Sequence, residues 1–106
     1  MSDQFQPATG PFLLRHLMIH GHVQGVGYRW SLRAQALQLQ LTGWVRNRRN
    51  GCVEALIYGT TPAVEALTAW AHQGPPESQV EHIDVSEPLA FEPHEMPMCF
   101  ELRPTC

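Results

Sequence analysis

The sequence predicts an α+β sandwich in which two helices cover one face of an antiparallel sheet. Two stretches show strand-like alternation followed by the helical spacing of apolar residues, and a tight-turn signal, Asn50-Gly51, lies between them. This is the only turn short enough to join two strands directly, so both helices must be crossover connections. The order β-α-β-β-α-β, with a short terminal strand after four main ones, is that of the split βαβ, or ferredoxin-like, fold.

Length and composition predict one domain. The chain has 106 residues, of which 43% are apolar, enough for a core. Residues 1–11 are polar and lack the features of a signal peptide, so we expect a flexible leader there and the domain over 12–106. The net charge of −3 disfavours a nucleic-acid binder or an anionic-membrane binder, and no apolar run is long enough to span a bilayer.

The cysteines indicate a reduced compartment. Their number is odd, and Cys52, Cys99 and Cys106 show neither a CxxC pair nor a metal-type spacing. We therefore expect a cytoplasmic protein with no zinc site built from these three residues.

The first strand is predicted over 12–23, where the side chains alternate. One face is aliphatic and is expected to pack under the helices: Leu13, Leu17, Ile19 and Val23. The other face is expected to meet solvent: His16, Met18, His20 and His22. His20 and His22 are two residues apart on that face, which suits either a metal site or a solvated surface.

The first helix is predicted over 28–40, because Leu32, Ala36 and Leu39 form a stripe at i, i+4 and i+7. The second strand is "WVRNRR", over 44–49. Asn50-Gly51 then predicts a two-residue type I′ hairpin, in which both residues need positive φ. The third strand is "CVEALIY", and its inner face is expected to consist of Val53, Ala55 and Ile57.

The second helix is predicted to open at Thr61-Pro62, because proline at the first helical position loses no hydrogen bond. Its apolar face consists of Val64, Leu67, Trp70 and Ala71. Gly74-Pro75-Pro76 ends it. "QVEHIDV" is the fourth strand, residues 88–97 form a loop, and "MCFELR" is a short last strand.

The stretch "GHVQGVGYRW" is the strongest candidate for a functional site. Its three glycines do not fit the P-loop or dinucleotide-binding patterns. A glycine-rich turn between a strand and a helix nevertheless exposes backbone N–H groups beside the positive end of the helix dipole, and such a turn can hold an anion. Arg29 adds a fork of donors that matches two phosphoryl oxygens. The alternative is a strand-to-helix turn with a surface arginine.

"GHVQGVGYR" followed by "LTGWVRNRRNGCVEALIYG" resembles the acylphosphatase family. The similarity runs from His16 to Val85 and returns in the final strand at 100–103. The resemblance implies a small ferredoxin-like enzyme that hydrolyses the carboxyl-phosphate bond of acyl phosphates without a metal or other cofactor. Its substrate would be a small-molecule acyl phosphate.

The resemblance also implies the residues of the site. The family's catalytic arginine falls on Arg29 and its catalytic asparagine on Asn47. Its phosphate cradle falls on Gln24, Gly25, Val26, Gly27, Tyr28 and Arg29. An asparagine offers one acceptor and two donors with which to orient the attacking water.

Several alternatives remain open from the sequence. The same fold also serves as a catalytically silent anion-binding module, including at the start of larger hydrogenase-maturation proteins. An RNA-recognition module shares the topology, but the third strand offers one aromatic residue for base stacking. The basic residues Arg46, Arg48 and Arg49 either steer anionic substrates or make an edge soluble. We expect a monomer.

Overall fold

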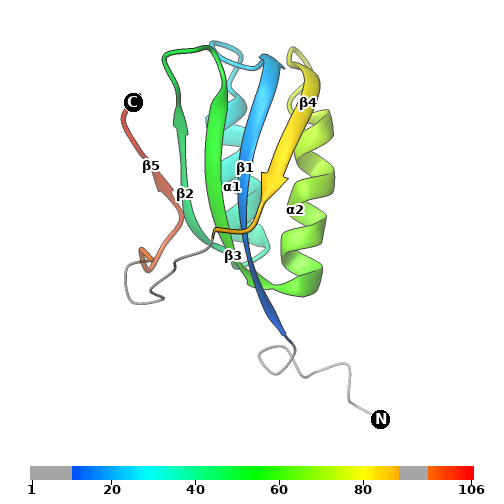
Figure 1. Cartoon of the computed structure of the whole chain (residues 1–106), viewed down its shortest axis with the longest axis vertical. Coiled ribbons are helices and arrows are strands. Elements are labelled where there is room, and N and C mark those ends of the chain that lie inside the picture. The colour runs from blue at the N-terminus through cyan, green and yellow to red at the C-terminus, as the bar shows by residue number, and fades with distance from the viewer. Residues whose placement is uncertain (1–10, 89–95) are drawn as a thin grey trace.

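The computed structural model describes residues 11–88 and 96–106 and contains the predicted order of elements. They are β1 (Phe12–His22), α1 (Tyr28–Gln38), β2 (Thr42–Asn47), β3 (Val53–Thr60), α2 (Thr61–Gln73), β4 (Gln79–Ser86) and β5 (Glu101–Leu102). The strands lie in the order β4-β1-β3-β2-β5, and both helices lie on one face of the sheet (Figure 1). The predicted ferredoxin-like fold is therefore confirmed.

The four main strands pair antiparallel, whereas β5 runs parallel to β2 along Trp44 and Val45. The core lies between the sheet and the helices. Its fully buried aliphatic side chains come from both layers: Leu17, Ile19, Val23, Leu32, Val45, Val53, Ile57, Val64 and Leu67. The predicted inner faces of the first and third strands are thus the ones that pack against the helices, with Leu13 at the margin of the core.

The first helix ends earlier than predicted, at Gln38. The chain leaves it through Gln40, whose φ is 61°. The N–H of Gln40 donates to the Leu37 carbonyl at 3.1 Å, and that of Leu41 donates to the Ala36 carbonyl at 2.9 Å. This is a Schellman ending, which usually has glycine at the left-handed position. A glutamine there gives no sequence signal, which explains the error.

The β2–β3 turn also differs from the prediction. Gly51 has a φ of 97°, but Asn50 is not among the positive-φ residues, so the turn is not type I′. The Gly51 N–H donates to the Arg48 carbonyl at 3.1 Å, and the Arg48 N–H donates to the Cys52 carbonyl at 2.8 Å. This pattern is a longer hairpin loop that ends in a left-handed glycine. The predicted strand over 44–49 correspondingly ends at Asn47.

The predicted last strand is shorter in the structure, where only Glu101–Leu102 form a ladder. Beyond it, the Arg103 N–H donates to the Val45 carbonyl and the Cys106 N–H to the Asn47 carbonyl, so the tail follows β2. The predicted leader lies outside the described residues except for Pro11, whose carbonyl accepts from Thr61. Most of the predicted loop at 88–97 also lies outside them. No helix of the described residues is long and apolar enough to cross a membrane.

Candidate functional site

The glycine loop joins the end of β1 to the start of α1. Gly25 and Gly27 have φ values of 78° and 82°, in the left-handed region that side chains rarely adopt. A Cβ placed on either glycine would meet nothing within 4 Å. These two glycines are therefore required by the backbone conformation, and the space over the loop is open. Gly21 differs, because it sits against the backbone of β4, beside a break in strand register.

Backbone donors accumulate in this loop. No oxygen of residues 11–88 or 96–106 accepts a hydrogen bond from the N–H groups of Gly25, Val26 or Gly27. The first bond at the helix start runs from the Ser31 N–H to the Gly27 carbonyl, at 3.0 Å. The N–H groups of the first turn of α1 also lack intrahelical partners. The loop thus offers a run of free donors at the positive end of the helix dipole.

Tyr28 anchors this run of donors to the core. Its side chain is only 1% exposed, and its hydroxyl donates to the Ala71 carbonyl at 2.7 Å. Its ring packs against Trp70, with the ring centroids 5.7 Å apart. Burial raises the pKa of the Tyr28 hydroxyl. Tyr28 therefore offers an anion its N–H only, while its side chain fixes the helix start.

Arg29 lies in the first turn of α1 and is half-buried. Within the part of the chain that the structure describes, its guanidinium has no hydrogen-bond acceptor and no carboxylate partner. An arginine keeps its charge at any physiological pH. The loop therefore combines neutral N–H donors with one full positive charge.

Gln24 holds the loop against the β2–β3 hairpin. Its Nε2 donates to the Arg48 carbonyl at 2.7 Å and to the Cys52 carbonyl at 2.8 Å. Both the loop and the hairpin lie at the same end of the molecule (Figure 1). The side chain of this predicted phosphate ligand is thus committed to the hairpin, and it joins the loop to the segment that follows Asn47.

Asn47 is the last residue of β2. It lies two residues beyond the fully buried Val45, so both side chains belong to the face of the sheet that the helices cover. Its Oδ1 is buried and accepts no hydrogen bond from the described residues. A buried acceptor without a donor is rare in folded proteins and requires an explanation.

The neighbouring arginines point to the other face of the sheet. The Nε of Arg46 and the Nη1 of Arg48 both donate to Oε1 of Glu54 at 2.8 Å. His16 approaches the other oxygen of that carboxylate, with Nε2 and Oε2 2.6 Å apart. This face is therefore not simply solvated, contrary to the prediction. Arg46 and Arg48 form an internal ion-pair network with Glu54, an acid that no sequence motif marks as their shared partner.

The network changes the ionisation of Glu54. Burial raises the pKa of its carboxyl, but the hydrogen bonds from His16, Arg48 and Arg46 outweigh burial and bring the pKa to about 2. A lowered pKa stabilises the fold above the ordinary value of 4.5, and this contribution is lost as the pH falls toward 2.

We expect Glu54→Gln to be less stable than the natural chain by about 1–3 kcal/mol at pH 7, because the two arginines lose their partner. The difference should shrink between pH 5 and pH 2. Chemical denaturation at several pH values measures it, and a constant difference across that range would contradict the assignment.

The fold and the loop together define a class of protein: a ferredoxin-like domain with an open, glycine-rich loop of N–H donors at its first strand-to-helix junction. The acylphosphatase family model matches residues 15–95. An acylphosphatase of Acidovorax sp. is 56% identical over 75 residues, which are 71% of this chain and 77% of the relative. One from Thermococcus kodakarensis is 52% identical over 79 residues, 73% of this chain and 87% of the relative.

A solved acylphosphatase structure from Coxiella burnetii superposes with a TM-score of 0.78 at 35% identity, over 87% of this chain and 93% of that one. The chain belongs to the acylphosphatase family.

Proposed function

We propose that Arg29, the loop amides and Asn47 carry out the hydrolysis of the carboxyl-phosphate bond of acyl phosphates in this chain. The observation that supports this most directly is a run of loop N–H groups beside Arg29 for which residues 11–88 and 96–106 offer no acceptor. Phosphoryl transfer has a loose transition state with charge on three equatorial oxygens. Fixed donors aimed at such charge are the main catalytic device available to a protein.

Asn47 is proposed to orient the attacking water. Its buried, unpaired Oδ1 is an acceptor for a water hydrogen, which would turn a lone pair of the water toward phosphorus. The Gln24 side chain donates to the Arg48 and Cys52 carbonyls, so the hairpin segment that follows Asn47 is held against the phosphate loop. Positioning of this kind replaces a strong base, because the mixed anhydride is already activated.

The leaving group supports the same mechanism. It is a carboxylate, whose conjugate acid has a pKa near ~4, so it departs without a general acid. An arginine, backbone donors and an asparagine are then chemically sufficient. The same residues would not suffice for a phosphate monoester, whose leaving alkoxide needs protonation.

The proposal is tested by measuring the hydrolysis of an aryl acyl phosphate, which is monitored by the decrease in the absorbance of the substrate. Turnover by the natural chain above the spontaneous rate is expected. Binding of inorganic phosphate without turnover would instead identify the catalytically silent module.

Inorganic phosphate should stabilise the fold. It mimics the phosphoryl group, and a ligand that binds only the native state raises stability by mass action. We expect the thermal midpoint to rise with phosphate over a range that reaches tens of millimolar, and not with chloride at equal ionic strength. In Arg29→Gln the phosphate-specific rise should be much smaller, whereas Arg49→Gln should retain it, because Arg49 lies in the exposed hairpin turn.

Activity should survive chelators. The loop contains no carboxylate or histidine side chain among Gly25–Arg29, and Arg29 supplies the charge that a metal ion would otherwise provide. We expect equal rates before and after treatment with EDTA. Loss of turnover that a divalent ion restores would contradict a metal-independent mechanism.

We also propose the compartment, the partners and the oligomeric state of the enzyme. The three free cysteines suit a reducing cytoplasm, and the negative net charge disfavours nucleic acid as a partner. We expect a monomer in solution, because the helices and the sheet already complete one core. Size-exclusion chromatography with light scattering measures the oligomeric state.

A further inference from the structure

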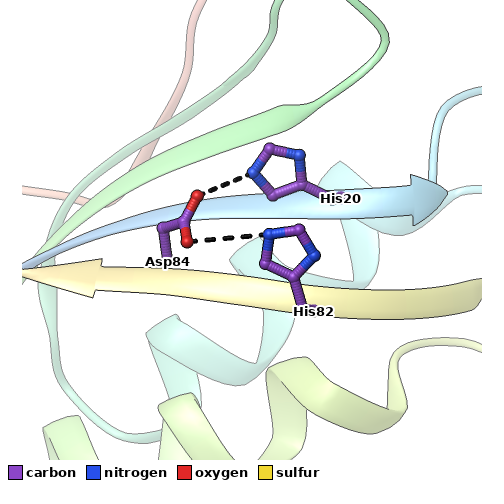
Figure 2. Close-up of side chains that lie close together, drawn as sticks. All are labelled: His20, His82 and Asp84. Atoms are coloured by element: carbon purple, nitrogen blue, oxygen red, sulfur yellow. Dashed lines mark hydrogen bonds and ion pairs between the residues drawn. The ribbon is translucent and has the colours of Figure 1, made fainter.

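Two histidines and an aspartate meet on the face of the sheet opposite the helices (Figure 2). His20 lies on β1 directly opposite His82 of the edge strand β4, and Asp84 follows two residues further along β4. His82 and Asp84 therefore share one face of that strand. By their two-residue spacing alone, His20 and His22 suit a metal pair. The structure instead places His20 with two residues that are far away in the sequence.

The three side chains converge through their ligand atoms. The Nε2 atom of His20 lies 2.9 Å from Oδ2 of Asp84, and the Nε2 atom of His82 lies 3.6 Å from Oδ1 of the same carboxylate. The two imidazole rings stack, with their centroids 4.2 Å apart and an angle of 10° between their planes. One potential ligand atom from each residue lies within 4.8 Å of the others.

We propose that His20, His82 and Asp84 form a zinc-binding site that is separate from the phosphate loop. Zinc prefers imidazole nitrogen and carboxylate oxygen at about 2.0–2.2 Å, in a tetrahedral arrangement. Adjacent ligand atoms in such a tetrahedron are about 3.3–3.6 Å apart, from the same bond lengths. The two observed N···O separations, 2.9 and 3.6 Å to the two oxygens of Asp84, are close to that range.

Binding requires only side-chain rotation. The stacked rings must tilt so that both Nε2 lone pairs point at one ion. The backbones of β1 and β4 are already fixed by their ladder. The side chains of His82 and Asp84 are 59% and 67% exposed, so they are free to turn, and a water molecule has access as the fourth ligand.

Cys52 contacts the second ring nitrogen of His20, the one that does not face Asp84. Its Sγ lies 3.2 Å from Nδ1 of His20. When zinc occupies Nε2, the imidazole proton must reside on Nδ1, and the sulfur can then accept a weak hydrogen bond from it. Zinc-bound histidines usually have an acceptor at the second nitrogen, most often a carboxylate, a carbonyl or water, and here the sulfur takes that place.

Isothermal titration with zinc chloride at pH 7.5 tests the site. The exposed thiols Cys99 and Cys106 are rival zinc ligands, so every protein carries Cys99→Ser and Cys106→Ser. We expect one ion per chain, and an affinity at least tenfold lower in His82→Gln and in Asp84→Asn. The matched control is His72→Gln, because His72 is an exposed histidine of α2 whose Nδ1 contacts only the Thr68 carbonyl.

Imidazole ¹H–¹⁵N NMR spectra provide a second measurement of zinc binding, which does not rely on the heat of binding. Zinc should shift the ring nitrogens of His20 and His82 together, and leave those of His72 unchanged. Thermal midpoints without zinc establish that each variant is folded. The proposal is overturned if zinc fails to bind in the millimolar range, if His82→Gln and Asp84→Asn bind it as tightly as the parent, or if His72→Gln weakens it equally. In each of those cases the cluster is a set of hydrogen bonds to Asp84 only.

Discussion

Replacement of Arg29 by lysine should abolish most of the activity, although the positive charge is kept. A guanidinium presents two parallel donors to two phosphoryl oxygens, whereas an ammonium is a single compact charge. The loss should correspond to ~2–4 kcal/mol of transition-state stabilisation, as for an oxyanion donor, or a factor of about 30 to 10³ in kcat/KM. Steady-state hydrolysis of an aryl acyl phosphate measures it.

Two controls separate this result from a loss of structure or of general charge. The Arg29 side chain makes no hydrogen bond or ion pair with the described residues, so the thermal midpoint of Arg29→Lys should stay close to that of the natural chain. Arg49→Lys, an arginine-to-lysine change in the exposed hairpin turn, should retain full activity. An Arg29→Lys variant within threefold of the natural rate would show that charge alone is sufficient.

Replacement of Asn47 by alanine should lower turnover by a factor of about 10² or more and leave phosphate binding nearly unchanged. The proposed role of Asn47 is to hold the water, and that interaction acts only in the reacting complex. Arg29 and the loop amides remain to bind phosphate. The phosphate inhibition constant and kcat, measured on the same preparation, separate these two contributions.

The structure predicts the stability of this variant as well. Because Oδ1 of Asn47 is buried without a hydrogen-bond donor among the described residues, its removal breaks no side-chain hydrogen bond with them. The thermal midpoint should therefore change little or rise slightly, since an unsatisfied buried oxygen is itself unfavourable. A parallel loss of turnover and of phosphate affinity would make Asn47 a phosphate ligand. Unchanged turnover would require another residue to orient the water, and His22, which is exposed beside the loop, would be tested next.

The parts of the fold that could be predicted from the sequence are those that depend on near neighbours. The alternation along β1 and the apolar stripe of α1 repeat every few residues. In both elements the repeat arises because one face is buried in the core. The start of α2 at Thr61 and its end before Gly74 follow from the local chemistry of proline and glycine. The end of α1 was missed because Gln40 adopts a conformation that its residue type does not indicate.

The residues of the candidate site also fall into two groups, those that the sequence indicates and those that depend on tertiary contacts. Gly25, Gly27 and Arg29 could be proposed from the sequence because one short segment supplies the turn, the helix start and the charge. Asn47 entered only through the resemblance to a known family. No local pattern indicates that the side chain of Gln24 binds the hairpin carbonyls, since that contact depends on the order of β1, β3 and β2 in the sheet.

The order of the elements, the face that each one buries, and the glycine loop with its arginine can therefore be inferred from local patterns in the chain. Which polar side chains share a partner depends instead on how distant segments come together. Glu54 meets His16 across 38 residues, and Asp84 meets His20 across 64. The buried face of a strand or helix can be predicted from its own residues, because one face is apolar and the other is polar. Ion pairs and ligand sets depend on strand order and register, which only the assembled sheet fixes.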